Sequence, residues 1–193
     1  MFPKPRTALN PNTYEYESAP LVKPTGFREY DARWLFGPEI NALGIEALGL
    51  GLGTLFQEMG HDRVVVGHDY RSYSMAIKQA LSLGLIGAGC EVLDIGLALS
   101  ATAYFAQFYL DVPCVAMVTA SHNENGWTGV KMGAQRPLTF GPDEMGRLKE
   151  TVLGGKWAQR PGGSVAHIAG VAERYIAAAA ARAKLTRPLQ GVG

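Results

Sequence analysis

The sequence predicts an α/β fold in which a mixed, mostly parallel sheet is sandwiched by helices. Short runs rich in β-branched residues alternate with helical patterns, which is typical of βαβ units. The 24 glycines suit tight connections between such units, and 47% hydrophobic residues in a chain of 193 can form a sizeable core. Right-handed crossovers would place the carboxyl ends of the parallel strands along one edge.

Length allows one domain, or one domain and part of another. Residues 1–24 are proline-rich and lack periodicity, so we expect an extended, poorly ordered N-terminal arm. Residues 25–155 carry the alternating pattern and form the expected α/β domain. Residues 156–193 begin with a linker and continue as an alanine-rich helix, and we interpret them as the start of a second domain.

The first half of the domain predicts two strands and two helices. A short strand is expected at 25–31, before a turn at Arg33. Apolar side chains recur every three or four residues from Pro38 to a capping Gly60, which predicts a helix. The β-branched run at 63–67 is the next strand, and the following helix begins at Ser72 or Ser74 and ends near Ala88.

The second half continues the same alternation of strands and helices. Its remaining expected elements are strands at 91–95, 113–118 and 128–132, and helices at 101–110, 142–153 and 166–184. The helix at 142–153 is amphipathic, with Pro142 in its first turn. Glycines within the first long helix reduce its helix propensity, so we expect close packing against a neighbour.

The composition excludes several classes of partner. The formal net charge of +1 provides no general attraction to nucleic acid or anionic membrane. There is no apolar run long enough to span a bilayer and no secretory signal at the N-terminus. Cys90 and Cys114 lie in apolar surroundings without metal-ligand spacing, which favours buried thiols. We therefore expect a soluble cytoplasmic protein with no nucleic-acid or membrane partner.

The most informative segment runs from Thr119 to Lys131 and reads T-A-S-H-N-E-N-G-W-T-G-V-K. It places Ser121 just beyond an apolar strand, at the head of a loop rich in Asn and Gly. A serine in such a loop is ordinarily a turn former or a helix cap. Phosphoryl transfer requires in addition a proton-handling group and cations, which His122 and Lys131 can supply.

Two further segments carry charged residues beside predicted strands. The first, from Gly26 to Arg33, reads G-F-R-E-Y-D-A-R; it is either a charged turn or a phosphate-binding element built on Arg33 and Tyr30. The second reads V-V-V-G-H-D-Y-R-S-Y-S and spans 64–74. We expect Asp69 and Arg71 there to form a structural ion pair or to cap the next helix.

These three segments, in their order along the chain, resemble the signatures of the α-D-phosphohexomutases. The family loop reads T-A-S-H-N-P followed by N-G-x-K, its opening F-R-x-Y-D-I-R-G, and its strand-loop V-V-V-G-R-D-x-R-x-S-S. Departures from this pattern include Glu124 for proline, Trp34 for glycine, His68 for arginine and Tyr73 for serine. The wording fits the bacterial phosphomannomutase/phosphoglucomutase branch better than the phosphoglucosamine mutases, whose openings read F-G-T-D-G.

The resemblance implies a four-domain enzyme that interconverts hexose 6-phosphate and hexose 1-phosphate through hexose 1,6-bisphosphate. This chain would supply the domain that bears phosphoserine, and the other mutase domains would be absent from it. Ser121 would carry the phosphoryl group and bind Mg²⁺ through its phosphate, with the carboxylate ligands outside this chain. Lys131 would transfer protons or stabilise charge, His122 would orient the phosphoryl oxygens, and Arg33 and Tyr30 would line the cleft.

Three other interpretations remain. The chain could be a truncated, non-catalytic mutase domain that acts as an interaction module, or part of an enzyme resembling phosphoglucosamine mutase. A dinucleotide-binding domain is disfavoured, because the glycines at 48–54 lie inside a helical pattern and do not follow a strand. If the mutase interpretation holds, we expect the 193-residue chain to fold alone with little or no mutase turnover.

Overall fold

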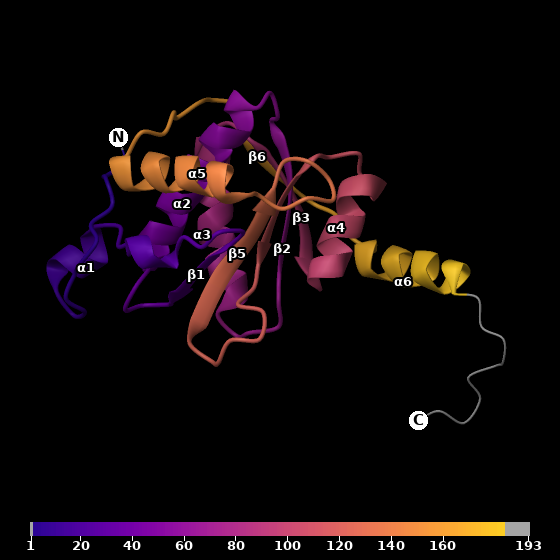
Figure 1. The fold of residues 1–193 in the computed structure, drawn as a ribbon, viewed down its shortest axis with the longest axis horizontal. Helices are drawn as coiled ribbons and strands as arrows, with labels where there is room; N and C mark the ends of the chain where they lie inside the picture. The colour runs from indigo at the N-terminus through magenta and orange to yellow at the C-terminus, as the bar shows by residue number, and fades with distance from the viewer. Residues whose placement is uncertain (1, 184–193) are drawn as a thin grey trace.

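The computed structural model describes residues 2–183, and its centre is a six-stranded mixed sheet (Figure 1). The spatial order of the strands is β1-β5-β4-β2-β3-β6. Pairs β4–β2, β2–β3 and β3–β6 are parallel, whereas β1–β5 and β5–β4 are antiparallel. The strands are β1 (Ala32–Leu35), β2 (Arg63–His68), β3 (Glu91–Leu97), β4 (Cys114–Val118), β5 (Trp127–Gly133) and β6 (Ser164–His167). The mixed, mostly parallel sheet predicted from the sequence is confirmed.

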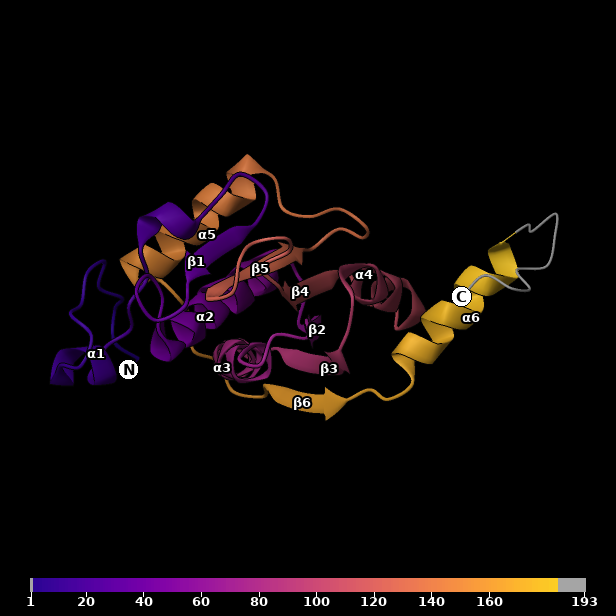
Figure 2. The ribbon, with the colours of Figure 1, turned by 90° about the horizontal axis from the view of Figure 1, so that it is seen from below.

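Helices cover both faces of the sheet (Figure 2). One face packs against α2 (Ala42–Glu58), α3 (Ser74–Gly87) and α5 (Pro142–Gly154), and the other against α4 (Ser100–Tyr109). Helix α6 (Val171–Arg182) lies beside α4. Its Val171 is buried in the hydrophobic core on the α4 face of the sheet. Successive residues of β2 point into opposite cores, Val64 and Val66 into one and Val65 into the other, so this strand is buried on both faces.

The predicted extended arm is wrong. A short helix, α1 (Tyr14–Ser18), is followed by Leu21 and Val22, which are fully buried. Asn41 holds this segment in place: its Oδ1 accepts from the Leu21 amide at 2.9 Å, and its Nδ2 donates to the carbonyls of Tyr16 and Ala19. These bonds satisfy backbone groups of the arm that would otherwise be buried without partners.

Asn41 also explains why α2 begins later than Pro38. Its Oδ1 accepts a hydrogen bond from the Gly44 amide at 2.8 Å, which makes Asn41 the N-cap. The expected strand at 25–31 is a short 3₁₀ helix, η1 (Pro24–Gly26), followed by a turn in which the Arg28 amide donates to the Asp31 carbonyl. The strand itself is displaced to β1, where it pairs with β5.

The last predicted helix begins five residues later than expected, because β6 occupies part of its range. Residues of β6 pair in parallel with β3, from Ser164 opposite Glu91 to His167 opposite Asp94. Most side chains of β6 are exposed, so this edge strand has no apolar pattern by which it could be recognised. The end of that predicted helix and residues 185–193 lie outside the described residues.

The contact between α2 and α3 depends on two glycines, Gly49 of α2 and Gly84 of α3. The glycines of the first long helix predicted close packing of this kind for α2. A Cβ atom added at Gly49 would lie 2.2 Å from the Leu81 carbonyl oxygen. One added at Gly84 would lie 2.1 Å from the Glu46 carbonyl oxygen. Both obstacles are backbone atoms, so the two helices can approach this closely only if these positions lack side chains.

We predict that Gly84→Ala lowers the free energy of unfolding by about 3 kcal/mol, because the two helices must separate. Gly146→Ala is the matched control: it lies within α5, and an added Cβ meets no atom within 4 Å. That control should gain about 0.5–1 kcal/mol from improved helix propensity. Urea unfolding of both variants measures the difference, and equal effects would contradict the proposed close contact.

Candidate functional site

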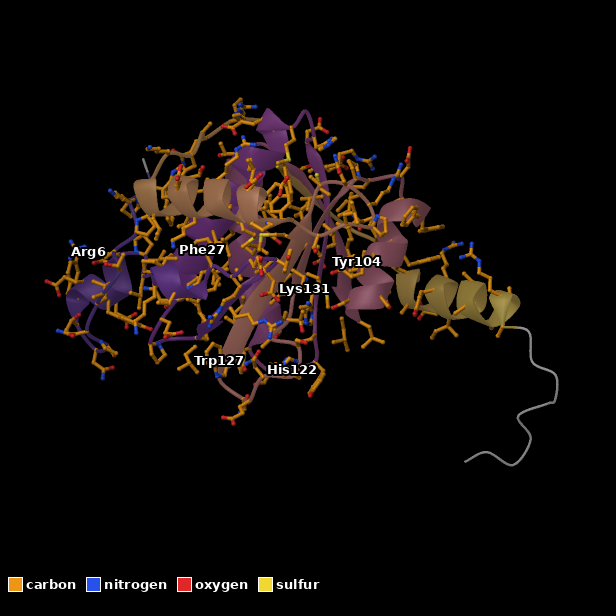
Figure 3. The ribbon with its side chains drawn as sticks, viewed as in Figure 1. Arg6, Phe27, Tyr104, His122, Trp127 and Lys131 are labelled. Carbon is orange, nitrogen blue, oxygen red and sulfur yellow. The ribbon has the colours of Figure 1, made fainter. Side chains whose placement is uncertain are left out.

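The predicted site lies where β2 and β4 end and β5 begins. The connection between β4 and β5 forms a loop, residues 119–126, which we call the Ser121 loop. Its first residue is tied back to the sheet, because the Thr119 amide donates to the Gly129 carbonyl at 2.9 Å. Strand β1 pairs antiparallel with β5 and places Arg33 opposite Gly129. The predicted segments 26–33 and 119–131 therefore meet at this edge. His122 marks the same end of the sheet in Figure 3.

Ser121 is exposed and has a left-handed backbone conformation, with φ of 56°. This conformation costs a non-glycine residue about 1–2 kcal/mol, so the surrounding contacts must maintain it. The Ser121 amide donates to the Thr119 hydroxyl at 3.0 Å, which closes a tight local turn. The Ser121 Oγ atom lies 3.4 Å from Nδ1 of His122, and both side chains are open to solvent.

Two arginines from distant segments hold the loop. Nη1 of Arg33 donates to Oδ1 of Asn123 at 2.8 Å. Nη2 of Arg71 donates to the Asn123 carbonyl at 2.8 Å and to the Ser121 carbonyl at 3.3 Å. The loop is therefore fixed by side chains that approach from β1 and from the connection between β2 and α3.

Asp31 links two of the predicted cations. Its Oδ2 atom accepts from Nε and Nη2 of Arg33 at 3.0 and 2.7 Å, and lies 3.7 Å from Nζ of Lys131. Tyr104 of α4 lies near this group (Figure 3); burial and the negative charge of Asp31 raise the pKa of its phenol. One carboxylate thus orients Arg33 and Lys131 together, without neutralising both.

Asp69 and Arg71 form the structural ion pair expected from the sequence. Burial would raise the pKa of Asp69, but hydrogen bonds from Ser74 and the Arg71 amide, the Thr119 hydroxyl, and the Arg71 charge together lower it. The Ser74 hydroxyl donates to Oδ1 of Asp69 at 2.6 Å. The Arg71 guanidinium, which binds the Ser121 loop, is thus also held in position by the buried carboxylate of Asp69.

Four of the predicted site residues gather here, and the fifth does not join them. Ser121, His122, Arg33 and Lys131 belong to the loop or to the strands that flank it. Tyr30 is 56% exposed in the turn before β1, and within residues 2–183 its side chain forms no hydrogen bond to the cluster. Its predicted role in binding substrate therefore rests on the sequence resemblance alone.

Sequence reasoning gave no role to Asn123, Asp31 or Tyr104. Asp31 had a recognisable signal, because it lies two residues before Arg33 at the start of a strand, where such residues share a face. Asn123 accepts from Arg33 across 90 positions of sequence, and no local pattern indicates that contact.

The side chains that the structure describes do not by themselves form a magnesium site. Within residues 2–183 no group of three or more His, Cys, Asp or Glu side chains is placed to hold a metal ion. The nearby carboxylates of Asp31 and Asp69 are already paired with cations. Mg²⁺ prefers oxygen ligands from carboxylates and phosphates, so the described side chains offer it too few.

Comparison with known proteins decides the family. Residues 24–158 match the model for phosphoglucomutase/phosphomannomutase, alpha/beta/alpha domain I. The chain belongs to the phosphoglucomutase/phosphomannomutase family. It is 40% identical over 113 residues to a phosphomannomutase of Escherichia coli, which covers 58% of this chain and 24% of that protein.

Two other relatives extend this comparison. The chain is 38% identical over 105 residues to a probable phosphoglucosamine mutase of Pyrococcus furiosus, covering 54% of this chain and 23% of that protein. It superposes on a phosphoglucomutase/phosphomannomutase family protein of Burkholderia thailandensis with a TM-score of 0.79 and 27% identity. That match covers 88% of this chain and 38% of the solved one. The chain thus spans about a quarter of the length of the relatives from Escherichia coli and Pyrococcus furiosus.

The described helices include none that is both long and apolar enough to cross a membrane.

The backbone of Ser121 provides a test of the loop geometry. We predict that Ser121→Gly is about 1 kcal/mol more stable than Ser121→Ala, because only glycine adopts a φ of 56° without cost. At Gly146, inside α5, the opposite order is expected: alanine should be more stable than glycine there, as is usual within a helix. Chemical unfolding of the variants gives the comparison, and a more stable Ser121→Ala would disprove the left-handed conformation.

Asp69 should contribute stability that depends on pH. Because its folded pKa lies below the ordinary value of 3.8, this contribution is complete above that value and is lost as the pH falls through the folded pKa. We predict that Asp69→Asn costs about 1–3 kcal/mol at pH 7 and less at pH 3. Denaturant unfolding at both pH values measures this, with exposed Asp62→Asn as control. A cost independent of pH would contradict the ionised pair.

Proposed function

We propose that this domain carries the phosphoryl group of a phosphohexomutase on Ser121. The parent reaction interconverts hexose 6-phosphate and hexose 1-phosphate of glucose or mannose through a hexose 1,6-bisphosphate. The observation that carries the proposal is the position of Ser121 in a domain I of this family. Its hydroxyl is exposed on a loop that Arg33 and Arg71 hold in a conformation unfavourable for serine.

In the transfer step, phosphorylated Ser121 gives its phosphoryl group to a hydroxyl of the hexose monophosphate. The bond between phosphorus and Oγ breaks, a bond to the sugar oxygen forms, and the proton of the sugar hydroxyl ends on Oγ, which becomes the free serine hydroxyl. The return step transfers the other phosphate to Oγ and releases the isomer. Arg33 and Lys131 would stabilise charge on the transferring group, and Lys131 could also exchange protons. His122, 3.4 Å from Oγ, would orient the phosphoryl oxygens.

We further propose that the enzyme uses Mg²⁺ and is located in the cytoplasm. Mg²⁺ would supply positive charge beside the phosphoserine, with ligands beyond the phosphate drawn from outside the described residues. A cytoplasmic location fits the two free cysteines, of which burial raises the pKa of Cys90 to about 11. Because the described residues lack such ligands, we propose that the 193-residue chain alone shows little or no multiple turnover.

A phosphoglucosamine mutase is the second candidate. The observation in its favour is the 38% identity to the relative from Pyrococcus furiosus. The same carrier serine would then act on an amino sugar phosphate. Parallel assays with glucose, mannose and glucosamine phosphates on a full-length homologue distinguish these substrates.

The decisive experiment is the intact mass of the chain before and after incubation with glucose 1,6-bisphosphate and Mg²⁺. We expect a gain of one phosphoryl group on the wild type and none on Ser121→Ala. Ser164→Ala is the matched control, because Ser164 is an exposed serine at the start of the edge strand β6, and it should be modified like the wild type. Modification that persists in Ser121→Ala, or that is absent from the wild type, would disprove the assignment of carrier.

A further inference from the structure

The two arginines contact the Ser121 loop at Ser121 and Asn123, but its last residue, Gly126, is held by a different residue. Tyr73 lies at the N-cap of α3, and its side chain makes no capping hydrogen bond there. Instead its hydroxyl reaches the end of the loop, 53 and 54 positions further along the chain. The Tyr73 side chain therefore does not cap α3 and contacts the end of the Ser121 loop instead.

The Tyr73 hydroxyl uses both its donor and its acceptor capacity at the junction between the Ser121 loop and β5. It accepts from the Gly126 amide at 2.9 Å and donates to the Trp127 carbonyl at 2.9 Å. The Gly126 carbonyl in turn accepts from the Phe36 amide at 2.9 Å. Both backbone groups of Gly126 are therefore bound by residues outside the loop.

The ring of Tyr73 is itself fixed. It stacks on Phe36 with a centroid separation of 6.1 Å and an interplanar angle of 14°, and packs against the core beneath α3. Such stacking restricts the ring, so the position of its hydroxyl is determined before any ligand binds. Gly126 has a φ of 94°, which glycine alone adopts readily, and this places the loop end where the hydroxyl can reach it.

We propose that Tyr73 is a positioning residue for phosphoryl transfer at Ser121, acting by fixing the end of the Ser121 loop. This inference rests on the proposed function. Tyr73 does not bond to Ser121; with Arg71 it fixes the loop at both sides of the exposed segment 124–125. A carrier serine must approach its acceptor in line, and a loop released at one end would sample other positions of Oγ.

The step that Tyr73 supports is the transfer described above, and the hydroxyl itself exchanges no atom or proton. Removing it should therefore lower the maximal rate of Ser121 phosphorylation and leave the half-saturating concentration of glucose 1,6-bisphosphate unchanged. A residue that touched the sugar would change both quantities. We expect the maximal rate to fall about tenfold, the size of effect that one lost hydrogen bond can produce.

The test compares Tyr73→Phe, which retains the stacked ring, with Tyr16→Phe. The matched control also removes a phenol that donates to a backbone carbonyl, that of Gly37 at 3.0 Å, but it does not contact the Ser121 loop. Amide hydrogen exchange measured by NMR should show Gly126 exchanging about tenfold faster in Tyr73→Phe, with no change in Tyr16→Phe. Intact mass over time gives the rate of Ser121 phosphorylation in the same proteins.

Each outcome has one meaning. Faster exchange at Gly126 with a lower maximal rate and an unchanged half-saturating concentration supports the proposal. Unchanged exchange at Gly126 overturns it, as does faster exchange with an unaltered rate. If the wild type accepts no phosphoryl group, the proposed function fails and the positioning role fails with it, while exchange at Gly126 still decides whether Tyr73 fixes the loop.

Discussion

The guanidinium of Arg71 is the contact on which the site depends. It lies between the carboxylate of Asp69 and the carbonyls of Ser121 and Asn123, and so joins the end of β2 to the loop after β4. A loop of eight residues with exposed serine and glutamate has no core of its own. Its shape must come from partners outside it, and a charged donor held by a buried carboxylate is among the stronger ones available.

The electrostatics of the site suit a residue that gains and loses a phosphate. Arg33 and Lys131 share the single carboxylate of Asp31, so this group retains net positive charge beside the loop. A phosphoserine brings about −1.5 to −2 charges near neutral pH. The cations are already oriented by Asp31 and Asn123, so the proposed phosphorylation of Ser121 would require little reorganisation of them.

The fold supports this arrangement through close packing away from the site. Helices α2 and α3 meet through Gly49 and Gly84, and α3 begins at the residue after Tyr73. The same helix supplies Ser74, which binds Asp69. The placement of α3 therefore sets two anchors of the loop at once, one through the ion pair and one through the phenol. The N-terminal segment, bound by Asn41, completes the core beside α2.

The sequence alone determined the buried strands β2 and β4 and most helices, and it predicted Ser121 as the residue that carries the phosphoryl group. Strand burial and helix faces follow from local periodicity, and the serine is marked by the residues next to it. Only the tertiary structure decided the edge strand β6, the packed N-terminal segment, and the anchoring of the loop by Asn123 and Tyr73. These features depend on hydrogen bonds between segments far apart in sequence, whose register is set by packing and leaves no periodic signal in the chain.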